Sequence, residues 1–308
     1  MSLRPTVVSA IEAAGLDPTY VEDLINRTVA EDLDGGVDVT SAATVPADQR
    51  STMDLVTRGA GVAAGIPVAA AVFDVVSDGD AHITVVSSDG TRVLPGDVLL
   101  TVTGRTRHLL TAERTALNLL CHLSGVATAT SQWADTLEGT PARIRDTRKT
   151  TPGLRVLEKY AVRCGGGVNH RMSLSDAALV KDNHVVAAGG VAAAFDAVRT
   201  MWPGLAVEVE VDSLSQLSDV LDAGADLVLL DNFVPDQMRV AVAIAVEHAV
   251  HSGRPRALLE ASGGLVLSDA AAVGATGVDY IAVGALTHSA PVLDVGADLR
   301  PLTLQVTE

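Results

Sequence analysis

The second half of the chain alternates short apolar runs with helical segments, and this alternation constrains the fold more than any other feature. Apolar runs of strand length occur at residues 142–147, 178–182, 205–212, 226–231, 256–264 and 279–285. Segments with helical periodicity separate them, at 154–162, 191–202, 214–224, 236–250 and 268–277. Repeated strand–helix units form a parallel sheet, and this many in series favours a closed α/β barrel.

The first half of the chain has a mixed texture that predicts a separate α/β domain. Helical periodicity is expected over 6–15, 18–33, 66–76 and 111–137, the last with Gly125 as a weak point, and alternating strands over 51–58, 81–88 and 96–104. We place the N-terminal domain at 1–125, joined by the tail 290–308, and the barrel at 126–289.

Each apolar run of the barrel ends beside a polar or small residue. These residues are Lys149 just beyond the first run, then Lys181, Glu210, Asp231, Ser262 and Gly284. The C-terminal ends of barrel strands converge on one mouth, where the chemistry of such enzymes sits. Glu208 and Glu210 lie two residues apart and share one face of a strand, which we predict to point inward. Two buried acids need cations or a metal to offset their desolvation.

Positive charge is concentrated in one window of an acidic chain. The net charge is −16, yet nine of the 22 Lys and Arg residues lie between Arg143 and Lys181, with every lysine of the protein among them. Such a concentration predicts a pocket for a strongly anionic ligand. Arg155, Lys159 and Arg163 repeat every four residues, which we interpret as a solvated helix face.

Other sequence features exclude several classes of protein. The acidic balance argues against nucleic-acid binding, and no apolar run of about 18 residues predicts a membrane span. The N-terminus lacks the pattern of a secretory signal, so a cytoplasmic protein is expected. Cys121 and Cys164 fit neither a disulfide framework nor a metal site and are predicted to be small buried hydrophobes.

Glycine-rich stretches and acids supply the remaining candidates. Gly165–Gly167 allow a tight turn beside His170 and Arg171, while ASGGL and VGALTHS follow the last two apolar runs. Barrels often bind a phosphate with backbone N–H groups of their last two loops. Glu210 and Asp231 are candidate ligands of Mg²⁺ shared with substrate phosphates. A Ser–His–Asp hydrolase has no G-x-S-x-G stretch to support it.

The run DTRKTTPGLRVLEKYAVRCGGGVNHRMSLSDAALVKDNH closely resembles quinolinate phosphoribosyltransferases, also called nicotinate-nucleotide diphosphorylases (carboxylating), of the type II phosphoribosyltransferase family. Further matching pieces are EDLDGGVDVTS, AERTALNLLCHLSGVAT, VEVEVDSLSQL, LVLLDNF, LEASGGL and YIAVGALTHS, in family order over nearly the whole chain. The resemblance implies an N-terminal α/β sandwich-like domain and an incomplete TIM-like barrel. It also implies a homodimer with shared active sites, or a hexamer built from such dimers.

The family reaction joins quinolinate to 5-phosphoribosyl 1-diphosphate and releases diphosphate and CO₂, giving nicotinate mononucleotide for NAD synthesis. Carried over by position, the quinolinate residues are Thr147, Arg148, Lys149, His170, Arg171 and Lys181, with Arg114 from the partner subunit. Glu210 and Asp231 would face the ribose and its Mg²⁺-bound diphosphate. The 5-phosphate would be held by Ser262, Gly263, Gly264, Val283, Gly284 and Ala285, with His288 as a further candidate. We expect Lys149, Lys181, Glu210 and Asp231 to carry the chemistry.

Three other functions remain open from the residues. A related phosphoribosyltransferase could act on nicotinate or another acid, although one carboxylate would leave part of the arginine cluster unpaired. A catalytically silent sugar-phosphate-binding module would not demand Glu210 and Asp231. An aldolase-type barrel would use Lys181 as a Schiff base, which borohydride trapping would reveal.

Overall fold

A computed structural model describes residues 3–302, which form two compact units. Within these residues the first unit comprises 3–129, 156–165 and 290–302, and the second comprises 130–155 and 166–289. Helix α6 (Arg155–Cys164) therefore belongs almost entirely to the first unit, although the residues on both sides of it belong to the second. The sequence-based limits did not separate this helix from the barrel, and as domain boundaries they stay a prediction.

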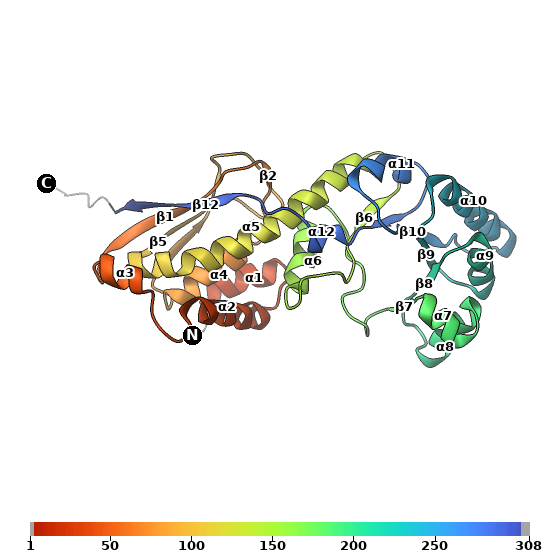
Figure 1. The fold of residues 1–308 in the computed structure, drawn as a ribbon, viewed down its shortest axis with the longest axis horizontal. Helices are drawn as coiled ribbons and strands as arrows, with labels where there is room; N and C mark the ends of the chain where they lie inside the picture. The colour runs from red at the N-terminus through yellow and green to blue at the C-terminus, as the bar shows by residue number, and fades with distance from the viewer. Residues whose placement is uncertain (1–2, 303–308) are drawn as a thin grey trace. The chain divides into compact units, whose positions relative to one another are not determined.

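The first unit is built on a four-stranded antiparallel sheet (Figure 1). Its strand order is β12 (Val295–Pro301), β1 (Arg50–Thr57), β5 (Val98–Arg105) and β3 (His82–Val85), and β2 (Gly61–Val62) pairs with β4 (Arg92–Val93). The helices are α1 (Pro5–Ala13), α2 (Pro18–Leu33), α3 (Val39–Thr44), α4 (Ile66–Val76) and α5 (Thr106–Thr136). Because β12 pairs with β1 along its length, Val295–Pro301 forms an edge strand of this sheet.

Local sequence signals explain where the first helices begin. Pro18 occupies the first turn of α2, where its missing N–H costs nothing, and the Asp17 carboxylate accepts from the Thr19 N–H at 2.9 Å. The predicted bounds 18–33 and 66–76 coincide with α2 and α4.

Helix α5 continues through Gly125 without a break, contrary to the weak point that the sequence suggested. A Cβ atom at Gly125 would lie 2.2 Å from the carbonyl oxygen of Pro291. Glycine is therefore required here by the close approach of the returning chain and not by a bend in the helix.

The second unit is built on a six-stranded parallel sheet with the strand order β6-β11-β10-β9-β8-β7. The strands are β6 (Arg143–Arg145), β7 (Ala178–Val180), β8 (Val207–Val211), β9 (Leu227–Asp231), β10 (Leu258–Ser262) and β11 (Tyr280–Ala282). The helices are α7 (Asp182–Ala188), α8 (Val191–Met201), α9 (Leu214–Ala223), α10 (Pro235–Ser252), the 3₁₀ turn η1 (Leu267–Asp269), α11 (Ala270–Gly274) and α12 (Ala285–His288). This alternation confirms the predicted strand–helix repeat, and Figure 1 shows α8, α9 and α10 lying outside the strands.

Side-chain contacts show that this sheet is strongly curved. Arg145 on β6 and Glu208 on β8 are separated by three intervening strands, so about 19 Å would part their backbones in a flat sheet. Their side chains nevertheless approach to 3.8 Å, between Nη1 and Oε1. The strands must therefore wrap around these side chains as a barrel, while β6 and β7 end the strand order, so that the barrel is incomplete.

The prediction that Lys159 lies on a solvated helix face was wrong. Lys159 is fully buried on α6, and its neighbour Glu158 is buried with Oε1 2.8 Å from Nε2 of His122. Arg163 is exposed, and its guanidinium lies 5.5 Å from the Tyr160 ring. Spacing of four residues identifies a common face of a helix, but it does not tell whether that face meets solvent. Cys121 and Cys164 are half-buried and free.

Lys159→Arg should therefore destabilise the protein, because a bulkier, planar cation must enter a filled site. We expect a loss of about 1–3 kcal/mol in the free energy of unfolding, as for other overpacked sites. Urea titration measures the loss, with the exposed Arg163→Lys as control. Wild-type stability of the Lys159 variant would show that its surroundings are loosely packed.

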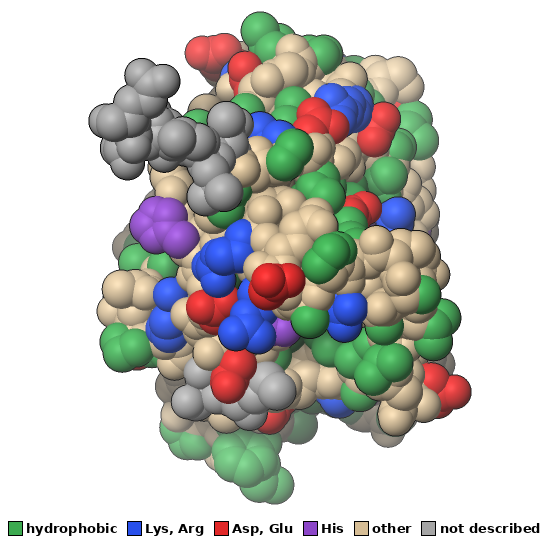
Figure 2. Space-filling model, turned by 90° about the vertical axis from the view of Figure 1, so that its left-hand side faces the viewer, with side chains coloured by type: hydrophobic (Ala, Val, Ile, Leu, Met, Phe, Trp, Pro, Cys, Tyr) green, Lys and Arg blue, Asp and Glu red, His purple; other side chains and the backbone are tan. Residues whose placement is uncertain are grey.

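The surface carries mixed charge. Figure 2 shows one face on which cations and carboxylates are interspersed instead of separated into patches. Ion pairs of this kind join strands of the first unit, such as Arg300 with Asp54 at 2.8 Å. Among the described residues, no helix is both long and apolar enough to cross a membrane.

Candidate active site

Two carboxylates lie at the C-terminal ends of adjacent barrel strands. Glu210 on β8 is largely buried, and its Oε2 lies 2.8 Å from Nζ of Lys181, which directly precedes α7. Asp231 ends β9, and burial, followed by the charge of Glu210, raises the pKa of its carboxyl. The predicted convergence of Lys181, Glu210 and Asp231 at the barrel mouth is therefore present. The two carboxylates offer oxygen ligands to a cation, and the ammonium of Lys181 offsets part of their negative charge.

Asn232, which the sequence analysis did not single out, packs between Asp231 and a glycine loop. Its Nδ2 donates to Oδ2 of Asp231 at 2.8 Å, and its backbone N–H donates to the Ser262 carbonyl at 2.9 Å. Its φ of +57° lies in the left-handed region, an uncommon conformation for a residue other than glycine. A Cβ at Gly263 would lie 2.3 Å from Oδ1 of Asn232. The acid and the loop Ser262–Gly264 are thus packed as one assembly.

The loop after β11 packs against Lys149. Thr287 Oγ1 donates to the Lys149 carbonyl at 2.8 Å, and a Cβ at Gly284 would lie 2.8 Å from Cδ of Lys149. The same Cβ would lie 3.2 Å from Nε2 of His288. Val283, Gly284 and Ala285 therefore lie beside the stem of Lys149, whose side chain is exposed. The Lys149 N–H donates to Thr147 Oγ1 at 3.0 Å, which shapes the loop around Arg148.

Arg148 and Arg171 form an unusual pair of cations. The Nε atom of each is buried without a hydrogen-bond partner among the described residues. Burial, followed by the charge of Arg148, lowers the pKa of Arg171. Arg171 Nη1 donates to the Ala177 carbonyl at 3.0 Å, which leaves the rest of its fork available. Two half-buried guanidinium groups that repel each other, each with a buried Nε, are suited to an anion with more than one negative oxygen.

His170 has both ring nitrogens occupied by the protein. Nε2 lies 2.9 Å from Oε2 of Glu208, and Nδ1 accepts from the Arg171 N–H at 2.7 Å. The predicted substrate contact of His170 stays a prediction, since neither nitrogen is free in this arrangement. Arg114 is exposed on α5 in the first unit and makes no hydrogen bond or ion pair within residues 3–302.

The chain matches a known protein family and known relatives over most of its length. The family model "Quinolinate phosphoribosyl transferase, C-terminal domain" matches residues 126–298, and the model of the N-terminal domain of the same family matches 38–124. A nicotinate-nucleotide pyrophosphorylase (carboxylating) from Mycobacterium leprae is 54% identical, covering 90% of this chain and 96% of its own. The chain belongs to the quinolinate phosphoribosyltransferase family.

Other relatives agree. A quinolinate phosphoribosyltransferase (decarboxylating) from Nicotiana tabacum is 37% identical, covering 99% of this chain and 90% of its own. The crystal structure of NadC from Streptococcus pyogenes superimposes with a TM-score of 0.87 at 37% identity, covering 94% of this chain and 99% of its own. The fold of this quinolinate phosphoribosyltransferase family member, an N-terminal α/β domain and an incomplete barrel, is therefore as the sequence predicted.

Arg145 and Glu260, which the sequence analysis did not single out, form a charged cluster inside the barrel with Glu208, which it predicted to point inward. Arg145 Nη1 lies 2.6 Å from Oε2 of Glu260, and Glu208 completes the group beside His170. Burial, followed by the charge of Glu208, raises the pKa of the Glu260 carboxyl. The two-residue spacing of Glu260 and Ser262 was the available signal, because it places both on the same strand face.

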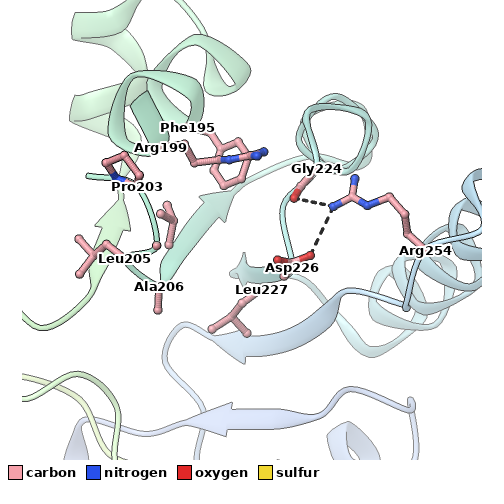
Figure 3. A pocket seen from close by; sticks show the side chains of 11 residues that line it. Phe195, Arg199, Pro203, Leu205, Ala206, Gly224, Asp226, Leu227 and Arg254 are labelled. Atoms are coloured by element: carbon pink, nitrogen blue, oxygen red, sulfur yellow. Dashed lines mark hydrogen bonds and ion pairs between the residues drawn. The ribbon is translucent and has the colours of Figure 1, made fainter. Parts of the chain in front are cut away.

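A pocket of about 560 Å³ opens near the starts of β8 and β9. It lies at the ends of these strands opposite to those that carry Glu210 and Asp231. Figure 3 shows Arg199 and Arg254 reaching toward the chain around Gly224 and Asp226. Arg199 donates to the Ala223 carbonyl at 3.1 Å and Arg254 to the Gly224 carbonyl at 2.8 Å. These arginines cap the C-terminal end of α9, where a cation stabilises the helix dipole. Their role is thus explained without a ligand.

Proposed function

We propose that the protein transfers the phosphoribosyl group of 5-phosphoribosyl 1-diphosphate to quinolinate with decarboxylation. The products are nicotinate mononucleotide, diphosphate and CO₂, which is a step of NAD biosynthesis. The observation that best supports this reaction is the pair Arg148 and Arg171, whose buried Nε atoms lack hydrogen-bond partners among the described residues. Quinolinate brings two carboxylates, which match two guanidinium groups in charge and hydrogen-bonding capacity.

The second substrate, 5-phosphoribosyl 1-diphosphate, would bind beside the loops that follow β10 and β11. Ser262–Gly264, Gly284 and Ala285 offer backbone N–H groups for the 5-phosphate, with His288 beside Gly284. The N–H of Val283, which the resemblance also placed there, donates instead to the Arg145 carbonyl at 3.0 Å. Lys149 packs against Gly284, so its ammonium can reach both the phosphate loop and the quinolinate arginines. Glu210 and Asp231 then face the ribose and the diphosphate.

The donors at Glu210 and Asp231 fit a magnesium ion. Mg²⁺ prefers carboxylate oxygens and commonly shares its remaining positions with substrate phosphates and water. When bound, the ion would neutralise the charge of the departing diphosphate. When the ion is absent, the ammonium of Lys181 offsets the negative charge of Glu210.

The reaction needs positioning and charge stabilisation more than proton transfer. Diphosphate leaves C1 of the ribose while positive charge develops on the ring, which the carboxylate of Glu210 or Asp231 stabilises. The pyridine nitrogen of quinolinate attacks C1 and forms a pyridinium. The C2–carboxylate bond then breaks, CO₂ leaves, and the electron pair left on C2 is stabilised by the pyridinium and takes up a proton from water. Arg148 and Arg171 hold the acid so that nitrogen and C1 meet in line.

A homodimer with shared sites completes this proposal. Arg114 is exposed and unpaired within the described residues, which suits a cation that serves a neighbouring chain. It would bind a quinolinate carboxylate in the partner's barrel, and the dimers could assemble further into a hexamer.

The alternatives fit less well. Nicotinate has one carboxylate and would leave the buried Nε of one guanidinium unpaired. An aldolase needs a neutral amine, whereas Lys181 is ion-paired with Glu210 at 2.8 Å. A silent binding module would not require the acid pair. The direct test incubates purified protein with 5-phosphoribosyl 1-diphosphate, Mg²⁺ and carboxyl-labelled quinolinate, and measures CO₂ and mononucleotide together. Absence of both products from folded protein would refute the proposal.

Gly263→Ala should disable the phosphate loop. Its φ of +109° disfavours any side chain, and the new Cβ would collide with Asn232, which holds Asp231. We expect kcat/KM for 5-phosphoribosyl 1-diphosphate to fall by at least about 100-fold, as for other small displacements of reacting groups.

The matched control is Gly253→Ala, at the end of α10. Its φ of +65° is also positive, but it lies in the left-handed region that L-residues can enter, and its Cβ would meet nothing within 4 Å. Steady-state kinetics and circular dichroism should show both variants folded and only the control active. Equal activity of the two would mean that Asn232 moves aside freely.

A further inference from the structure

The turn that carries Arg171 is fixed from inside the barrel. The His170 N–H donates to Oδ1 of Asp146 at 2.7 Å, and Asp146 is fully buried. The Arg171 N–H donates to Nδ1 of His170 at 2.7 Å. The backbone N–H groups of His170 and Arg171 are therefore held by the Asp146 carboxylate and by the His170 ring, respectively.

These contacts determine the tautomer of His170. A backbone N–H can only donate, so Nδ1 must carry a lone pair and no proton. The ring proton is then on Nε2, which points at Oε2 of Glu208 at 2.9 Å. His170 and Glu208 are 8% and 3% exposed, so water does not compete for this hydrogen bond.

The distances within the cluster place Arg145 beside Glu260 and His170 beside Glu208. Arg145 Nη1 lies 2.6 Å from Glu260 and 3.8 Å from Glu208. Nε2 of His170 shows the reverse preference, at 2.9 Å from Glu208 and 3.8 Å from Glu260. Each acid thus has its own partner, and that of Glu208 is the histidine.

We propose that Glu208 is a positioning residue for the quinolinate-binding arginine Arg171. By accepting the Nε2 proton, Glu208 holds the His170 ring in the tautomer and orientation that receive the Arg171 N–H. The main chain of Arg171 is thereby fixed, and its guanidinium, tied to the Ala177 carbonyl, faces the acid with Nε unpaired among the described residues. This inference rests on the proposed function for the identity of the acid.

The test compares three variants. Glu208→Met keeps the length of the side chain but removes the acceptor, so KM for quinolinate should rise at least about tenfold while KM for 5-phosphoribosyl 1-diphosphate stays within about threefold. Glu208→Gln retains an acceptor oxygen and should recover most of the loss. The control, Glu260→Gln, mimics a protonated acid in the same cluster without a hydrogen bond to His170 and should leave both KM values near those of the wild type.

The tautomer provides a readout independent of activity. Long-range ¹H–¹⁵N correlation of histidine rings, assigned with His170→Gln, should show the wild-type ring protonated at Nε2 alone, and the signal should change in Glu208→Met. A wild-type ring protonated at Nδ1, an equal rise of both KM values in Glu208→Met, or the same defect in Glu260→Gln would overturn the positioning role. Wild-type protein that releases no CO₂ from quinolinate would instead refute the proposed function, and the ring signals would still decide whether Glu208 sets the tautomer.

Discussion

Quinolinate should be preferred over nicotinate by at least about 10³ in kcat/KM, because a site built for a charged group rejects the analogue that lacks it. Arg148 and Arg171 each have a buried Nε without a partner among the described residues, and the charge of Arg148 disfavours that of Arg171. Quinolinate supplies two carboxylates to this pair. Nicotinate lacks the carboxylate at C2, so one half-buried guanidinium with a buried Nε would remain without an anion.

The measurement is steady-state kinetics with each acid at saturating 5-phosphoribosyl 1-diphosphate and Mg²⁺. Mononucleotide formation is followed for both acids, and CO₂ release for quinolinate only. The variant Arg171→Gln supplies the control. It should lose most of the activity on quinolinate, and with it most of the preference for quinolinate over nicotinate. Comparable turnover of nicotinate by the wild type would contradict the quinolinate assignment.

Mixed dimers should recover activity that neither parent has. Arg114→Ala and Lys149→Ala proteins should each be nearly inactive, since both leave a substrate anion short of a charged partner. If Arg114 of one chain completes the pocket that contains Lys149 of the other, a mixed dimer has one site with both defects and one intact site. Equal amounts refolded together make half of the dimers mixed, so roughly a quarter of wild-type activity should return.

Each variant refolded alone is the control, and size measurements with one tagged chain confirm that mixed dimers form. Activity that stays at the level of the parents in confirmed mixed dimers would place Arg114 in the site of its own chain. The exposure of Arg114 and its lack of an ion pair within residues 3–302 are the structural reasons to expect the shared arrangement.

Much of the barrel and its mouth could be predicted from local sequence. Alternating apolar runs located the six strands, because a strand buried on both sides must be apolar and ends where polar residues begin. Since parallel strands end together, the sequence alone places Lys181, Glu210 and Asp231 at one mouth. The contact of Lys181 with Glu210 at 2.8 Å agrees with that reasoning.

The interior of the barrel could not be predicted in the same way. Arg145, Glu208 and Glu260 lie on three strands that are not sequence neighbours, and only the curvature of the sheet brings their side chains together. The same holds for His170, whose two nitrogens are occupied by a group from another segment and by the adjacent backbone. Sequence spacing reports which face of an element a side chain occupies, but not what lies opposite that face.

The sequence by itself determined the elements, the acidic and basic groups at the strand ends, and the family, since these depend on local periodicity and on specific motifs. Only the tertiary structure decided which residues are buried and what they contact. Lys159 is fully buried although its spacing is that of an exposed face, and Gly125 serves a close approach of Pro291 and not a break in α5. The physical reason is the same in both cases: burial and close packing are properties of two surfaces in contact, and a local pattern describes only one of them.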